Sequence, residues 1–369
     1  MRRVTRTKKS LVEKRSRSER DRFQSAAFLN EHYFEFQREL ACPESRDLEG
    51  WKRWRRKLRG ALRKTLCLDE LGKAPTPRPA VEEEIETADY IRQKVVYETF
   101  AGSWVSAYLL IPSRGPERKP AVICPHGHVR GAKEGVVNPE FSLGAAYGHE
   151  LARRGAIVLA PDNAGMGERD VFDPDAGERG CRLVWFRLNQ MGLDLTGFRV
   201  FDLMAGINLL TARNDVDGSR IGCAGLSGGC WLSQVLTALD RRIKAVILSG
   251  FFTTFVQTAW HGHCICHHPF GIGRICDMPD ISALIAPRPQ FVESGISDAP
   301  YPHEPAFGMV RNAYELLDAG ENLGLHRYRG GHMFHGGKSI PWLMATLGMA
   351  ELIGNRFSGG TDTRPLEPV

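Results

Sequence analysis

The chain has 369 residues, enough for one α/β domain with an extension, and its 42% hydrophobic and 25% charged residues are typical of an ordinary globular protein. No apolar run approaches the roughly 20 residues that cross a bilayer, so we expect no membrane span. Arg2 and Arg3 precede a polar stretch instead of an apolar one, which argues against an export signal and favours a cytoplasmic location.

The cysteine content points to a reducing environment. The number of cysteines is odd, nine, and Cys124 and Cys223 lie in apolar, strand-like runs. This distribution is typical of buried, reduced thiols and not of a secreted disulfide framework.

The net charge of +6 is concentrated at one end of the chain. Residues 1–66 hold 20 Lys/Arg against 9 Asp/Glu, whereas the remainder is mildly acidic. No nucleic-acid-binding motif accompanies the basic segment, so we expect a frayed tail and a solvated helix face, with no specific nucleic-acid partner.

The N-terminal part is predicted to be helical. We expect residues 1–22 to be a basic, disordered arm and residues 23–80 to be a helical extension that ends in a Pro-rich linker over 73–80. Two amphipathic helices are predicted, over 23–40 and 48–68, and homo-oligomerisation through them is a further expectation. In the second, apolar residues recur at helical spacing: Trp51, Trp54, Leu58, Leu62 and Leu66.

The catalytic domain is predicted over residues 81–369. Ile91–Glu98 and Val105–Ile111 indicate a hairpin. After it, short apolar strands alternate with helices, the strands over 121–124, 156–160, 221–224, 245–248, 290–293 and 325–328, and the helices over 143–153, 201–212, 229–239 and 307–317. This alternation predicts a doubly wound, mostly parallel α/β sheet, the α/β-hydrolase fold, with its site at the carboxyl ends of the strands.

The strongest chemical signal is Gly225-Leu-Ser227-Gly-Gly229, which lies between a predicted strand and a predicted helix. This G-x-S-x-G pattern places a serine on a sharp turn, where neighbouring Cβ atoms would clash. We predict that Ser227 is a nucleophile; an ordinary Gly-rich helix cap is the alternative.

A nucleophilic serine needs a base, and the base needs an acid partner. His332 follows the last predicted strand and is the predicted base, with His335 as the rival. Asp298 follows the strand 290–293 and is the predicted acid. Its weaker rivals are Glu293, Asp277 and Asp280, and a turn or N-cap role is the alternative for Asp298 itself.

The tetrahedral intermediate needs two N–H donors. We predict the backbone amide of Gly228 and, from the loop after 121–124, the amide of His128. A metal-binding role for His126 and His128 is the alternative, although two histidines alone supply too few ligands.

These segments resemble the α/β-hydrolase superfamily, especially its dienelactone-hydrolase and acetylxylan-esterase-like branch, over about 91–355. The matching residues are PHGH at 125–128, APDNAGMGERD at 160–170, DVDGSRIGCAGLSGG at 215–229, DISALIAPRPQFVESGISD at 280–298 and GGH at 330–332. The resemblance implies that a turn made of Asp162, Gly165, Gly167 and Glu168 supports the pocket and does no chemistry.

The segment Trp260–Phe270 is rich in His and Cys, with Cys276 beyond it. Cys264 and Cys266 are separated by one intervening residue, whereas structural zinc sites usually have two to four residues between paired cysteines. We therefore interpret it as a substrate-pocket loop with no metal; a metal site and a redox-active thiol pair remain as alternatives. The predicted substrate contacts are His126, Trp260, His263 and His335.

Together these residues predict a serine hydrolase that cleaves a small-molecule carboxylic ester without a cofactor. A carbon–carbon bond hydrolase and an acyltransferase would use the same residues. A non-catalytic binding protein of this fold would lack a triad member, and none is missing.

Overall fold

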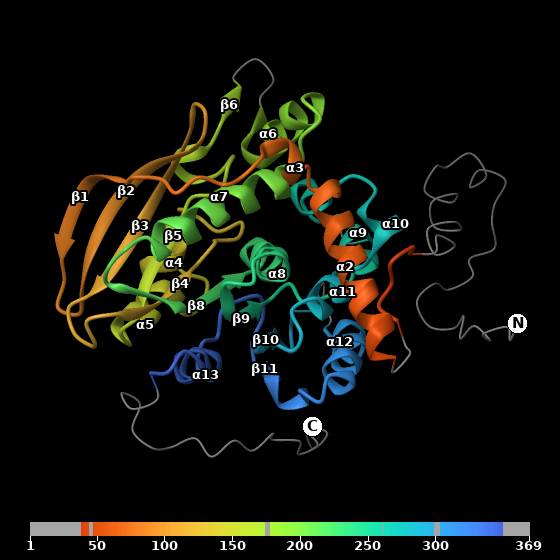
Figure 1. Cartoon of the computed structure of the whole chain (residues 1–369). Helices are drawn as coiled ribbons and strands as arrows, with labels where there is room; N and C mark the ends of the chain where they lie inside the picture. The colour runs from red at the N-terminus through yellow and green to blue at the C-terminus, as the bar shows by residue number, and fades with distance from the viewer. Residues whose placement is uncertain (1–37, 44–46, 174–177, 261, 299–302, 350–369) are drawn as a thin grey trace, which may run out of the picture.

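The structure is a computed structural model that describes residues 38–43, 47–173, 178–260, 262–298 and 303–349 (Figure 1). Its centre is a nine-stranded sheet in the order β1-β2-β3-β5-β4-β8-β9-β10-β11. The strands are β1 (Ala80–Glu86), β2 (Tyr90–Phe100), β3 (Ser103–Pro112), β4 (Lys119–Ile123), β5 (Ile157–Pro161), β8 (Val216–Leu226), β9 (Ile243–Ser249), β10 (Gln290–Gly295) and β11 (Leu323–Tyr328). A separate two-stranded sheet pairs β6 (Phe172–Asp173) with β7 (Glu178–Arg179).

The sheet is antiparallel at one end and parallel elsewhere. β1, β2 and β3 pair antiparallel, and β3 pairs antiparallel with β5. From β5 to β11 every pairing is parallel. β4 lies between β5 and β8. The strand that follows β4 in the chain is therefore added on one side of it, and the later strands of the sheet are added on the other side. The carboxyl ends of β4 and β8 are therefore neighbours, which is where open α/β sheets bind ligands.

Helices cover both faces of the sheet, as expected for a parallel sheet buried on both sides. One hydrophobic core joins the sheet to α2 (Leu48–Thr65), α7 (Leu195–Thr211), α8 (Gly228–Leu239), α11 (Met278–Ala283) and α12 (Glu304–Leu316). The other joins it to α4 (Glu134–Val137), α5 (Tyr147–Arg153) and α13 (Ser339–Thr346). The other helices of the described residues are α3 (Leu68–Leu71), α6 (Gly180–Gln190), α9 (Phe255–Trp260), α10 (Ile272–Ile275) and the 3-10 turns η3 (Gly167–Arg169), η4 (Ile265–His267) and η5 (Gly320–Asn322).

The predicted doubly wound, mostly parallel α/β sheet is confirmed. The unpredicted strands are β1, β6 and β7, and the unpredicted helices include α4, α6, α9, α10, α11 and α13. β1 has the sequence AVEEEIE and is exposed along its whole length, and its glutamates have low strand propensity. Pairing with β2, which the local sequence does not encode, is what makes it a strand.

The apolar side of α2 is buried against the body, and in Figure 1 this helix lies beside α10 at the right of the view. Trp51, Trp54, Leu58 and Leu62 are buried. Trp54 also donates its indole N–H to the carbonyl of Leu40. The predicted helix over 48–68 is thus confirmed over most of its length.

The basic side of α2 differs from the prediction of a solvated face. Arg55 and Arg59 both donate to the carbonyl of Leu284, which ends α11, and Arg59 also donates to Ala238 in the last turn of α8. Carbonyls at helix C-termini have no partner inside their own helix, and guanidinium groups satisfy them here. Burial lowers the pKa of Arg59 to about 9.

Most of the remaining N-terminal prediction concerns residues that the structure does not describe. The arm over 1–22 and most of the helix over 23–40 lie outside the described residues, and Glu39 and Leu40 form a turn. Among the helices that are described, none is long and apolar enough to cross a membrane.

Leu58→Ala tests whether α2 is part of the folded body. Leu58 is 0% exposed, so its truncation should lower the free energy of unfolding by about 2–5 kcal/mol. The neighbouring exposed Lys57→Ala is the matched control and should change it by less than about 0.5 kcal/mol. Urea denaturation measures both; equal effects would contradict the packing described.

Candidate active site

Ser227 occupies the turn between β8 and α8 with φ +58° and ψ −121°, a strained conformation for a residue with a side chain. Glycines make the turn possible. A Cβ on Gly225 would overlap the carbonyl of Gly229, and a Cβ on Gly229 would overlap the carbonyl of Pro125. The backbone amide of Ser227 donates to Ser249 at the end of β9. The turn has the geometry of a nucleophile elbow.

His332 and Asp298 form a hydrogen-bonded pair at the carboxyl ends of β11 and β10. Nδ1 of His332 lies 2.9 Å from Oδ2 of Asp298. The carboxylate is 4% exposed and the imidazole 31% exposed. A carboxylate on Nδ1 keeps the proton on that nitrogen and leaves Nε2 as the base.

The two loops that carry this pair are bonded to each other. The amide of Ile296 donates to Tyr328, and the amide of Ser297 donates to Gly330. A Cβ on Gly295 would overlap the carbonyl of Gly331, so the loops approach at the van der Waals limit. The separation between Asp298 and His332 is therefore set by the backbone.

The rival acids are engaged elsewhere. The carboxylate of Glu293 accepts the amides of His335 and Gly336 and the hydroxyl of Ser339. Asp277 is the N-cap of α11, and Asp280 completes its capping box. Each accepts backbone donors, and of the four predicted candidates Asp298 is the carboxylate that lies 2.9 Å from His332.

The rival base is engaged as well. The ring of His335 stacks on Tyr328 at 4.9 Å between centroids and meets His326 edge-on at 4.7 Å. Its Nδ1 accepts the amide of Gly337. His332 lines the hollow at Ser227 and His335 does not, so the substrate contact predicted for His335 is not seen there.

The loop after β4 lies against the nucleophile turn. A Cβ on Gly127 would be 2.9 Å from the Cβ of Ser227 and 3.1 Å from the amide nitrogen of Gly228. Gly228 is the first residue of α8, where amides have no partner within the helix. Both predicted amide donors, those of Gly228 and His128, thus belong to segments that meet at Ser227.

A small hollow opens above Ser227, with a volume of about 20 Å³. This is room for about one water molecule. Its walls are mostly apolar and are formed by Gly127, His128, Val129, Gly135, Leu143, Tyr147, Leu226, Ser227 and His332.

His126 does not lie where the sequence analysis expected it. Its side chain is 0% exposed, its Nδ1 bonds the carbonyl of Gly127, and its Nε2 accepts the amide of Asn163. With both nitrogens used and no surface free, it is a buried brace between two loops and not a substrate contact. Burial lowers its pKa to about 4 despite the nearby Asp162.

The turn after β5 braces the same loop, as the resemblance implied. Asp162 accepts the amide of Lys133 at 3.0 Å and its ammonium at 2.6 Å. Glu168 accepts the same ammonium at 2.6 Å. Lys133, which the sequence analysis missed, thus ties this turn to the segment that follows the loop after β4.

The remaining predicted contacts, Trp260 and His263, lie at the end of α9 and just after it. His263 lies against Phe251 at 4.4 Å between ring centroids, and its Nδ1 is 2.9 Å from that of His267. Burial lowers the pKa of His263 to about 4. The side chain of Trp260 lies outside the described residues.

Sequence reasoning also missed Cys181, which lies in the first turn of α6. Its Sγ is 3.4 Å from Nε2 of His128 and 3.2 Å from Sγ of Cys264. The pKa of Cys181 is far below its usual range, because Cys264 and Cys266 stabilise its thiolate by hydrogen bonding. Burial opposes a charged His128, but hydrogen bonds to Cys181 and Cys264 outweigh it and raise the pKa to about 9.

The strand order and the turn that carries Ser227 place this protein among the α/β-hydrolases. A family model described as "Abhydrolase family" matches residues 8–339, and the chain belongs to that family.

The relatives agree with this assignment. Over 245 residues the chain is 25% identical to "Putative hydrolase YtaP" of Bacillus subtilis (strain 168), covering 63% of this chain and 80% of that protein. A Bacteroides fragilis protein described as "a putative acetyl xylan esterase" has a TM-score of 0.75 at 19% identity, covering 88% of this chain and 95% of that one. A glucuronoyl esterase from Solibacter usitatus has a TM-score of 0.58 at 15% identity, covering 85% and 95%. These likenesses confirm the fold that the resemblance implied.

The lowered pKa of His126 leads us to expect that the protein loses stability in acid. Its folded-state pKa of about 4 is below the ordinary 6.5, so the unfolded chain takes up a proton first. The free energy of unfolding should fall as pH drops from about 6.5 to about 4. His126→Asn should be less stable at pH 7 and show a shallower pH slope in urea denaturation. Equal slopes in the two proteins would contradict the buried, neutral state of this ring.

Proposed function

We propose that this chain is a serine hydrolase that cleaves a carboxylic ester through an acyl-enzyme. The observation that carries the proposal is the 2.9 Å hydrogen bond between His332 and Asp298. His332 lines the same small hollow as Ser227, whose backbone is strained. This arrangement supports the roles predicted from the chain order of the three residues.

In the first half of the reaction, Ser227 Oγ attacks the ester carbonyl and its proton passes to Nε2 of His332. Asp298 stabilises the resulting imidazolium through Nδ1. The tetrahedral intermediate collapses, its bond to the alcohol breaks, and His332 returns the proton to the leaving alcohol. The acyl group then remains on Ser227 as an ester.

In the second half, water takes the place of the alcohol. His332 removes a proton from water, and the hydroxide adds to the acyl carbon. The bond to Ser227 Oγ breaks as the proton returns to it, and the free acid leaves. The amides of Gly228 and His128 would stabilise the oxyanion in both halves, each donor contributing roughly 3–4 kcal/mol.

The comparisons support esters as the substrate class, since the similar solved structures include a glucuronoyl esterase and a protein described as an acetyl xylan esterase. Because the hollow beside Ser227 is small, an ester with a short acyl chain, such as an acetyl ester, is the first reporter. Carbon–carbon bond hydrolysis and acyl transfer would use the same three residues, and nothing in the geometry favours either.

Ser227→Ala should abolish hydrolysis of p-nitrophenyl acetate and labelling by a fluorophosphonate, because the attacking oxygen is gone. A residual rate of roughly 10³–10⁴-fold over water could persist from binding and the oxyanion donors. Ser233→Ala is the matched control: Ser233 is buried in the same helix, and this variant should keep both properties. Labelling that persists in Ser227→Ala would refute the nucleophile.

Asp298→Asn should lower kcat by about 10⁴-fold, because an amide at this position favours the wrong tautomer of His332. Glu293→Gln is the comparison: Glu293 bonds loop amides, so this change should alter the melting temperature more than kcat. Steady-state kinetics and thermal melting of both variants decide the matter. A mild Asp298→Asn beside an inactive but folded Glu293→Gln would assign the acid to Glu293.

A further inference from the structure

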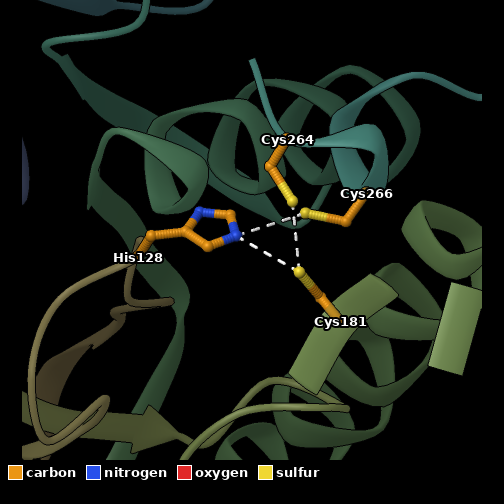
Figure 2. Close-up of side chains that lie close together, drawn as sticks. All are labelled: His128, Cys181, Cys264 and Cys266. Atoms are coloured by element: carbon orange, nitrogen blue, oxygen red, sulfur yellow. Dashed lines mark hydrogen bonds between the residues drawn. The ribbon is translucent and has the colours of Figure 1, made fainter. Parts of the chain in front are cut away.

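Four metal-binding side chains converge beside the hollow. Nε2 of His128 and the Sγ atoms of Cys181, Cys264 and Cys266 all lie within 4.8 Å of one another. Figure 2 shows them pointing toward a common centre from three segments. These are the loop after β4, the start of α6 and the segment around η4.

The separations suit a single tetrahedral ion. The Nε2 atom of His128 lies 3.4 Å from Cys181 and 3.5 Å from Cys266, and the sulfurs of Cys181 and Cys264 are 3.2 Å apart. Zinc bonds of about 2.3 Å to sulfur and 2.0–2.1 Å to nitrogen would put sulfurs about 3.8 Å apart and nitrogen about 3.6 Å from sulfur. These three separations need to change by about 0.1 to 0.6 Å to reach that geometry, and the other three are at most 4.8 Å.

The donor set selects the ion. Soft thiolates with one imidazole favour zinc, and the Cys₃His combination is a common structural zinc site. Donors this close leave room for one ion and not for a cluster of several irons and sulfides. Four protein ligands close the coordination sphere, which is typical of structural zinc and not of catalytic zinc.

A buried cation balances the charge. Three thiolates around a divalent ion leave one net negative charge, which is costly to bury alone. Arg199 is 1% exposed, and its guanidinium donates to the carbonyl of Ala164 at 2.7 and 3.1 Å. The same guanidinium hydrogen-bonds the side chain of Cys266, one of the four proposed ligands.

We propose that His128, Cys181, Cys264 and Cys266 bind one structural zinc ion, contrary to the metal-free pocket loop predicted from the sequence. The one-residue gap between Cys264 and Cys266 is no obstacle, because the other two ligands come from distant segments. A disulfide between Cys181 and Cys264 is the competing use of these thiols. It would explain two of the donors and leave His128 and Cys266 without a role.

The ion would clamp the loop after β4. His128 contributes its ring to the ion and, under the proposed function, its amide to the oxyanion. Zinc would then hold the oxyanion loop against α6 and η4 while leaving the triad complete. This consequence rests on the proposed function, whereas metal binding itself does not.

The test is the metal content of the full chain, purified with a reductant and without a metal-affinity tag. Elemental analysis should find about one zinc per chain in the wild type and in Cys67→Ser, a half-buried cysteine outside the cluster. Cys181→Ser should lose most of it. Zinc-free wild type given Co²⁺ should show the ligand-field and thiolate-to-cobalt absorption of a tetrahedral site, which needs no folded variant. Stripping zinc should also lower the melting temperature.

Several results would overturn the proposal. One is reduced wild type that, after incubation with Zn²⁺ and desalting, holds no stoichiometric metal and gives no tetrahedral cobalt spectrum. Another is a Cys181–Cys264 disulfide in metal-free protein from reducing cells, seen by peptide mass spectrometry. Equal zinc in wild type and folded Cys181→Ser would also exclude this site. If Ser227→Ala is inactive yet binds zinc like the wild type, the metal site stands independently of the esterase proposal.

Discussion

Direct contact between two backbone segments governs the site. The loop at Pro125–His128 lies so close to the Ser227 turn that Gly127 and Gly229 have no space for a side chain. Only glycine, which has no Cβ, can occupy these positions. The contact lies at the neighbouring carboxyl ends of β4 and β8, where successive strands begin to be added on the other side of β4. A developing oxyanion would meet amides from both segments because their spacing is set by main-chain packing.

The loop after β4 and the residues that follow it are also held by polar contacts with other segments. His126 bonds the Asn163 amide, and Lys133 bonds Asp162. His128 turns the other way, toward the sulfurs. The proposed zinc would be the third support, replacing a set of mutually hydrogen-bonded thiols by bonds of fixed geometry. Under the proposed function, amides held by these contacts would need little reorganisation during the reaction.

The features that could be predicted from the sequence are those encoded by local patterns of residues. Apolar runs between helices gave the parallel strands, and chain order together with strand ends brought Asp298 beside His332. It could not predict contacts between distant segments. Cys181 is 53 residues from His128 and 83 from Cys264, so no spacing rule joins them. Nor does a His-Gly-His segment say which ring is buried between two loops and which points toward the sulfurs.

The central claim is that an acyl group forms on Ser227. The most direct measurement is to mix the protein with p-nitrophenyl acetate, quench in acid during the first turnover, and map the acetyl group by peptide mass spectrometry. We expect one acetyl group on Ser227, which accumulates in the folded Asp298→Asn variant if deacylation slows more than acylation. Acetylation confined to Cys181, Cys264 or a histidine, with Ser227 unmodified, would contradict it.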